Sequence, residues 1–121
     1  PVFSDADLKP GVHINGIGAY TPEMQEIPAE TVVRARVIVD SRSASLAEAG
    51  DLIVPLQSGL ISEDSIHGEI GEVAAGQIPG RVSDEEVTFF KSVGVAVQDV
   101  AVADLILRRA ESLGLGTEVS L

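Results

Sequence analysis

The sequence contains no cysteine and no tryptophan among its 121 residues. Without cysteine, a disulfide framework and a thiolate metal site are both excluded, and we expect a protein of a reducing compartment such as the cytoplasm. Three Phe and one Tyr are the only aromatic residues, whereas hydrophobic residues make up 45% of the chain. The core is therefore expected to consist mainly of Val, Ile, Leu and Ala side chains.

Basic residues are also scarce, because eight Lys and Arg stand against 19 Asp and Glu, giving a net charge of −11. Nucleic acids and anionic membrane surfaces attract cationic proteins, so we expect no nucleic-acid partner and no membrane partner. The acidity is expected to keep the surface solvated. No apolar run reaches the roughly 18 residues that a membrane span needs, and no targeting motif is recognisable.

Short apolar strand patterns alternate with helical patterns along the chain. We predict strands over residues 12–17, 37–39 and 86–91, and helices over residues 28–34, 40–49, 70–75 and 93–113. Residues 51–56 form a short apolar segment broken by a proline, and the stretch from 57 to 69 contains no predicted strand. Alternation of strands with helices predicts an α/β fold with a parallel sheet.

The last predicted helix carries apolar residues at three- and four-residue steps, namely Val97, Val100, Ala103, Leu107 and Ala110. So much apolar surface predicts burial on two sides. One side would pack on the helix's own sheet, and the other on another domain or a partner subunit. We therefore expect a homodimer or a larger oligomer.

A glycine-rich stretch near the amino end, residues 11–26, reads GVHINGIGAYTPEMQE. Its strand pattern runs into Gly16 and Gly18, and open α/β sheets bind ligands where a strand ends in such a loop. The spacing matches two thirds of a dinucleotide fingerprint, with Thr21 in place of a third glycine. Pro22 prevents the immediate helix that would hold a pyrophosphate. A plain tight turn is the alternative interpretation of the same spacing.

These residues resemble the ornithine cyclodeaminase, mu-crystallin and archaeal alanine dehydrogenase family. The resemblance extends through further blocks in family order: DLIVP at 51–55, GEIGE at 68–72, GRVS at 80–83, FKSVG at 90–94, Gln98-Asp99 and Gly114-Leu-Gly116. It implies the carboxyl-terminal half of a Rossmann-type NAD(P)-binding domain, followed by helices that return to a catalytic and dimerisation domain. Residues 1–60 would form the partial Rossmann domain, and residues 61–121 the returning segment. The chain begins with Pro1 and looks like the carboxyl-terminal part of a longer protein, which would be inactive alone.

The resemblance also implies which residues face a cofactor, NAD(H) or NADP(H), and a substrate. It assigns cofactor contacts to the loop after the first strand and to a serine near residue 92, and substrate contacts to the two residues after that serine. The cofactor contacts are Asn15, Gly16, Ile17, Gly18, Ala19 and Ser92, and the substrate contacts are Val93 and Gly94. Judged from the sequence pattern alone, Asn15 can also cap a strand end, and Ser92 can cap the last helix.

Tyr20 departs from part of the family, because ornithine cyclodeaminases and archaeal alanine dehydrogenases resemble this stretch but carry an aspartate there that takes part in proton transfer. A phenol, with an ordinary pKa near 10, is a poor substitute. Ketimine and pyrroline-2-carboxylate reductases also lack that aspartate. Tyr20 is thus a candidate catalytic residue or pocket residue, with aromatic packing against the loop as the alternative.

The resemblance therefore implies an oxidoreductase that transfers hydride from NAD(P)H to a small imino acid, a ketimine or pyrroline-2-carboxylate reductase. Two alternatives stay open: an ornithine cyclodeaminase or alanine dehydrogenase, and a non-catalytic module that binds NADP(H) and a ligand as mu-crystallin does. An upstream phosphate-binding turn with substrate-clamping Lys and Arg would favour the enzyme.

Four other residues have ordinary interpretations. His13 is expected to be packed and hydrogen-bonded rather than a general base, and His67 to lie in a loop. Lys91 is predicted to be a surface charge, and Asp40 to cap a helix rather than to bind a ribose. The acidic residues between 69 and 86 lack His or Cys at ligand spacing, so no metal site is predicted.

Overall fold

A four-stranded parallel sheet forms the centre of the protein in this computed structural model, which describes residues 1–117 and 119. The strands are β1 (His13–Gly16), β2 (Arg36–Val39), β3 (Ile66–Glu69) and β4 (Thr88–Lys91), in the spatial order β1-β4-β2-β3. The chain is thus an α/β protein, as predicted. The sheet takes two strands from each side of residue 60, and the proposed division at that residue stays a prediction.

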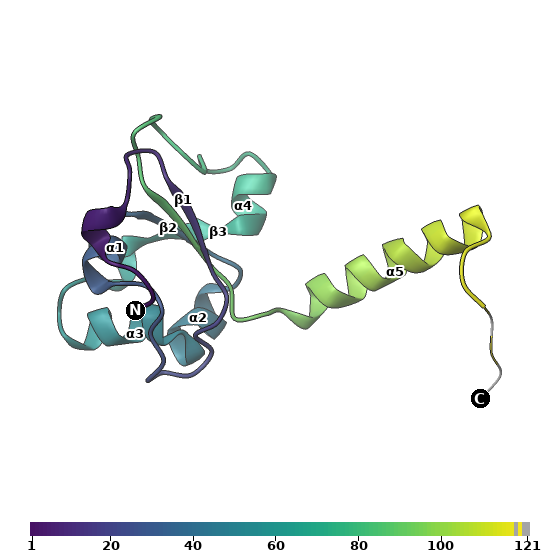
Figure 1. Ribbon diagram of the computed structural model, residues 1–121, viewed down its shortest axis with the longest axis horizontal. Coiled ribbons are helices and arrows are strands. Elements are labelled where there is room, and N and C mark those ends of the chain that lie inside the picture. Colours follow the sequence, from purple (N-terminus) through teal and green to yellow (C-terminus); the bar gives the residue numbers. More distant parts are fainter. Residues whose placement is uncertain (118, 120–121) are drawn as a thin grey trace.

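Helices connect the strands, as parallel pairing requires. The described helices are α1 (Ala29–Arg34), α2 (Arg42–Glu48), α3 (Gly50–Gln57), α4 (Ile70–Ala74) and α5 (Ala96–Leu113), with short 3-10 turns at Asp5–Asp7 and Glu63–Ser65. Helices α1 to α3 lie together beside one face of the sheet, and α4 lies toward the other (Figure 1). Every described strand runs in one direction, so all four carboxyl ends meet at the same edge.

The hydrophobic core lies between the sheet and helices α1 to α3. Val37, Val39 and Phe89 project from β2 and β4 into this layer, and Val32 and Leu52 project into it from α1 and α3. All five are essentially inaccessible to solvent. The continuous apolar run of β2 therefore reflects a strand covered on both faces, as is usual in parallel sheets.

Strand β3 lies where no strand was predicted, so that expectation is wrong. Its sequence, Ile66-His-Gly-Glu69, contains a single aliphatic residue, and the strand forms because it pairs with β2. His67 is part of this irregular pairing, because its Nδ1 accepts a hydrogen bond of 3.2 Å from the backbone N–H of Val37. An imidazole thus takes the place of a carbonyl where the register shifts between Val37 and Ile38.

Two helix predictions also differ from the structure. The apolar segment after residue 50 is helical (α3) despite Pro55, and Gly50 begins that helix rather than ending the previous one. A side chain at Gly50 would overlap the backbone of residues 21–24, which explains the glycine. The last helix begins at Ala96, not at residue 93.

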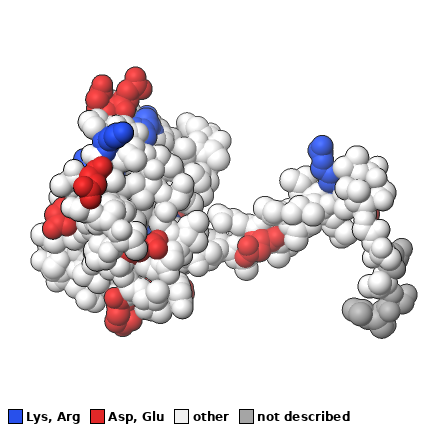
Figure 2. All heavy atoms as spheres, in the orientation of Figure 1, with Lys and Arg blue, Asp and Glu red and all other residues white. Residues whose placement is uncertain are grey.

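Helix α5 extends away from the sheet body, which we define as residues 1–95 (Figure 1). None of its 18 residues is buried. The expected packing on its own sheet is therefore wrong. Acidic side chains are spread over the sheet body, whereas α5 is mostly uncharged in the view of Figure 2. Within the described part of the chain, no helix combines the length and the apolar character needed to cross a bilayer.

Candidate functional site

The predicted site residues gather at the carboxyl edge of the sheet, where β1 and β4 end side by side. Gly16 lies opposite Lys91 in the register, and the backbone N–H of Ser92 donates to the Gly16 carbonyl at 3.1 Å. Two loops leave this edge, the first loop (residues 17–20) and the second loop (residues 92–94). The topology therefore brings together two predicted groups that lie some 70 residues apart in sequence.

The first loop is closed by the carboxylate of Glu26. The backbone N–H of Gly18 donates to Glu26 Oε1 at 2.9 Å, and a methyl group added at Gly18 would overlap that carboxylate. A methyl group at Gly16 would lie 2.8 Å from Cε2 of the Phe89 ring. The buried Phe89 ring thus favours glycine at position 16 by packing, whereas a side chain at position 18 would displace the Glu26 carboxylate from the loop. Sequence reasoning did not single out Glu26.

Side chains of the first loop alternate between solvent and interior. Ile17 and Tyr20 are 65% and 61% exposed, whereas Ala19 is buried. Little of the Tyr20 ring therefore packs against the loop, contrary to the packing alternative. Asn15, at the end of β1, is also exposed. The roles predicted for these residues toward a cofactor or substrate stay predictions.

The second loop is held by Asp40, which follows β2 on the other side of β4. Oδ2 of Asp40 accepts three hydrogen bonds, from Ser92 Oγ (2.8 Å) and from the backbone N–H groups of Val93 and Gly94 (2.9 Å each). Oδ1 accepts from the N–H of Ser41 at 2.7 Å. The carboxylate therefore occupies the anion-binding concavity that successive N–H groups create in this loop.

These contacts set the protonation of Asp40. Partial burial acts to raise its pKa, but the hydrogen bonds from Ser92 Oγ and from the backbone of Ser41, Gly94 and Val93 outweigh it and hold the pKa below its ordinary value. Asp40 is therefore an anion at neutral pH, with its negative charge directed into the protein's own donors.

Two predictions about this loop are wrong. Ser92 does not cap the last helix, because α5 begins four residues later and has Val95 in its capping position. Asp40 does not cap α2 either, because Ser41 accepts the capping hydrogen bond from the N–H of Ala44. In the sequence, a Ser or Asp between a strand and a helix can either cap the helix or bond to a neighbouring loop. Only the three-dimensional arrangement of the strands distinguishes the two roles.

Lys91 is not a surface charge, which corrects a further prediction. Its side chain and that of Asp51 in α3 are both fully buried, and Nζ lies 3.1 Å from Asp51 Oδ2. Alternation along β4 explains the position, because Phe89 and Lys91 share the face that packs on the helices. The signal available in the sequence was the placement of a single lysine at the end of an apolar strand.

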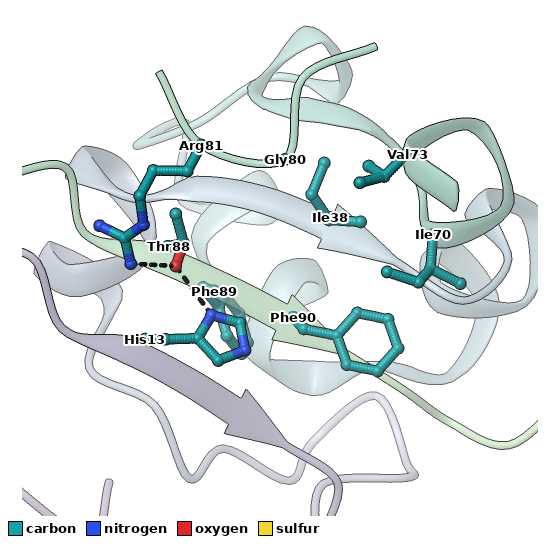
Figure 3. A pocket seen from close by; sticks show the side chains of 9 residues that line it. All are labelled: His13, Ile38, Ile70, Val73, Gly80, Arg81, Thr88, Phe89 and Phe90. Carbon is teal, nitrogen blue, oxygen red and sulfur yellow. Dashed lines mark hydrogen bonds between the residues drawn. The ribbon is translucent and has the colours of Figure 1, made fainter. Parts of the chain in front are cut away.

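The opposite face of the sheet carries a hollow of about 390 Å³ beside α4 (Figure 3). His13 lines it and is hydrogen-bonded as predicted, but it is exposed rather than packed: Nδ1 lies 2.7 Å from Thr88 Oγ1, and Nε2 lies 3.2 Å from Asn15 Oδ1. Thr88 Oγ1 also accepts from Arg81 at 3.0 Å, and the direction of its hydrogen bond with His13 depends on the tautomer of the ring. Of the predicted site residues, the hollow contains none.

Within residues 1–117 and 119, no three His, Cys, Asp or Glu side chains are grouped so that they can hold a metal ion. The site is composed of loop backbone, uncharged side chains and the carboxylates of Asp40 and Glu26, which accept backbone N–H groups of the two loops.

Comparison with known proteins places this arrangement in a family. Residues 1–114 match the ornithine cyclodeaminase/mu-crystallin family. A Delta(1)-pyrroline-2-carboxylate reductase of Bacillus cereus is 48% identical over 120 residues, which are 98% of this chain and 37% of that protein. The chain thus spans little more than a third of the length of this relative.

Solved structures agree with the sequence comparison. Thermococcus litoralis Delta(1)-pyrroline-2-carboxylate reductase, solved with NADH and L-proline, superposes with a TM-score of 0.88 at 39% identity, over 98% of this chain and 37% of that one. An archaeal alanine dehydrogenase dimer with bound NAD gives 0.84 at 39% identity, over 100% of this chain and 38% of that one. The chain belongs to the ornithine cyclodeaminase/mu-crystallin family.

Proposed function

We propose that this chain is the nicotinamide-side part of an NAD(P)H-dependent imine reductase. In this proposal the sheet is the carboxyl-terminal half of a Rossmann-type domain, and α5 leads back to a catalytic and dimerisation domain. The observation that carries the proposal is the convergence of the first and second loops at the carboxyl edge of adjacent parallel strands, where such sheets bind ligands.

The residues at this edge fit a nicotinamide ring. Ile17 offers an exposed apolar side chain, and Gly94, with a φ of 90°, has no atom within 4 Å of the place where a side chain would begin. The Asp40 carboxylate is bonded to the second loop's own N–H groups and is therefore directed away from a ligand at this edge. Ile17, Val93 and Gly94 would therefore hold the ring, and the Asn15 amide is the candidate partner for its carboxamide.

The phosphates of the nucleotide would be held outside these residues. The 121 residues contain no Gly-x-Gly-x-x-Gly turn leading directly into a helix, and that turn is the usual pyrophosphate site. The complete site would thus combine this chain's edge with a phosphate turn and with cationic groups for the substrate carboxylate.

The similarity to two pyrroline-2-carboxylate reductases supports a small cyclic imino acid as the substrate. NAD(P)H, when bound, supplies the hydride. The protein's own residues would orient the ring, exclude water from the C=N bond and donate a proton to nitrogen, for which the exposed Tyr20 hydroxyl is the candidate. The dimeric archaeal relative supports a homodimer in which α5 contributes to the interface.

Two alternatives are distinguished by the substrate. An ornithine cyclodeaminase or alanine dehydrogenase would oxidise an amino acid, and it would need a proton-transfer group other than the aspartate that Tyr20 replaces. A non-catalytic module would bind NADP(H) without turnover.

The test measures oxidation of NADH and of NADPH by the natural protein that contains this chain, with Delta(1)-pyrroline-2-carboxylate as the substrate. Turnover with this imine is the expected result, and no turnover of ornithine or alanine when each is supplied with NAD+ or NADP+ and the release of ammonia is measured. Tyr20→Phe should lower kcat by about 10²-fold if its hydroxyl is the general acid, with His67→Gln as a control outside the site. Nucleotide binding without turnover of any of the three substrates would favour the non-catalytic module.

A further inference from the structure

The buried Lys91–Asp51 ion pair has no role in the function proposed above. Both side chains are fully buried, Nζ and Oδ2 are 3.1 Å apart, and neither atom has a partner in hydrogen-bond geometry among the described residues. Taking two charges out of water costs several kcal/mol per ion, and apolar replacements of similar volume are often as stable. Stability alone therefore does not explain a single buried pair at this place.

Asp51 connects the pair to the first loop. Its Oδ1 accepts from the backbone N–H groups of Glu26 (2.7 Å) and Ile27 (2.9 Å). The Glu26 carboxylate in turn accepts from the N–H of Gly18 and fills the space beside it. Two carboxylates thus connect α3 to the first loop: Asp51 bonds to the backbone at residues 26 and 27, and Glu26 bonds to the backbone at Gly18.

Lys91 connects the pair to the second loop. It immediately precedes Ser92, and its carbonyl accepts from the backbone N–H of Asp40 at 3.1 Å. Asp40 Oδ2 then holds Ser92, Val93 and Gly94. The ion pair is therefore the point where the supports of the two loops meet, beneath the carboxyl edge.

We propose that Lys91 and Asp51 are positioning residues, whose ion pair fixes the first and second loops relative to each other so that both meet one face of a bound nicotinamide ring. The inference rests on the proposed function, because it assumes that a nicotinamide nucleotide binds at this edge. Neither residue touches the ligand. Their effect would be geometric, since a displacement of about 1 Å at a reacting centre can cost about 10²-fold in rate.

The decisive variant is the double substitution Lys91→Met/Asp51→Asn in the natural protein that contains this chain. It removes both buried charges together, and Asn Oδ1 can still accept from Glu26 and Ile27, so folding is expected to persist. The matched control is Arg36→Met/Glu86→Gln. The two side chains are 3.0 Å apart, but Arg36 begins β2 and Glu86 precedes β4, so the pair lies at the opposite edge of the sheet from both loops.

Two readouts separate positioning from general support, namely the fluorescence emission spectrum of bound NADH and the division of the kinetic effect between kcat and KM. The double variant should shift the emission of bound NADH toward that of free NADH. It should also lower kcat about tenfold while leaving the KM for NADH within about twofold, since the phosphates bind elsewhere. The control should change neither.

A folded double variant with the parent emission spectrum and the parent kcat would overturn the proposal. If the parent protein binds neither NADH nor NADPH, the proposed function fails together with this inference. If the parent binds and the double variant behaves like it, this inference alone fails.

Hydrogen exchange in the unmodified protein keeps the proposal testable if the double variant does not fold. The amides of Glu26, Ile27, Val93 and Gly94 should exchange slowly before any nucleotide is added, because the supports hold the loops in advance. Exchange of these four amides at the rate of an open loop would overturn the proposal.

Discussion

The sheet body and helix α5 both contain large apolar side chains, but these side chains are buried in the body and exposed in α5. Phe89, Val37 and Leu52 are inaccessible to solvent, whereas Leu105 and Val97 in α5 are 65% and 67% exposed. Hydrogen bonds within a helix depend on its own sequence, but burial depends on a surface supplied by something else. The apolar periodicity of a sequence therefore predicts that a helix forms, but it does not identify the surface against which the helix packs.

The largest expected effect lies in the body. Phe89→Ala removes a ring that packs in the core and against Gly16, and should lower the free energy of unfolding by about 3–5 kcal/mol. Denaturant titration measures this difference. A loss below about 1 kcal/mol would mean that the core between the sheet and α1 to α3 is not the stabilising unit.

A smaller effect is expected at the first loop. Gly18→Ala brings a methyl group into the Glu26 carboxylate and should cost about 1–3 kcal/mol, because the loop must shift or give up its hydrogen bond. Gly71→Ala is the matched control: Gly71 lies within α4 with nothing within 4 Å of the added methyl, so a gain of about 0.5–1 kcal/mol is expected there. Equal effects in thermal unfolding would contradict the contact assigned to Glu26.

The acid dependence of stability should also differ between the two regions. Because the pKa of Asp40 is lower in the folded protein, its contribution is present above the unfolded pKa of about 3.9 and is lost as the pH falls through the folded value. Asp40→Asn should flatten the fall in stability below about pH 4, relative to the parent. Asp104→Asn in α5 is the control, since its ion pair with Arg108 is exposed. If Asp40→Asn lost stability below about pH 4 as steeply as the parent, the hydrogen bonds from Asp40 to the second loop would not stabilise the protein as expected.

The smallest effect is expected for Leu105→Ala, which should change the free energy of unfolding of this chain by no more than about 0.5 kcal/mol. A loss of 2 kcal/mol or more would break the comparison, because large-to-small substitutions cost about that much only at buried sites. A loss that depends on protein concentration would identify a second copy as the cover of α5.

The sequence predicted the parts of the fold that depend on local pattern. The predicted strands 12–17, 37–39 and 86–91 correspond to β1, β2 and β4, and the glycine-rich loop lies at the end of β1 as expected. Strand β3 escaped because Ile66 is its single aliphatic residue. Its order depends on pairing with β2, and a one-dimensional pattern does not contain that pairing.

The site was predicted in outline, by resemblance rather than by spacing. The two loops were identified, but what holds them was not. Asp40, Asp51 and Lys91 act across the fold, and Lys91 lies 40 positions from Asp51 in the sequence. Asp40 had an ordinary interpretation as a cap and Lys91 as a surface charge, and Asp51 was not singled out. Only the parallel order β1-β4-β2, which places β4 between the other two strands, brings them beneath one edge.

The carboxylate of Asp40 occupies the backbone N–H groups of the second loop that an external anion would otherwise bind. The N–H groups of Val93 and Gly94 would otherwise attract a phosphate, but a covalently attached anion already fills them and does not diffuse away. If a nicotinamide nucleotide binds at this edge as proposed, the filled concavity would disfavour its phosphates and leave the approach open to its ring. The orientation of the proposed dinucleotide would then be set by a carboxylate that the ligand does not touch.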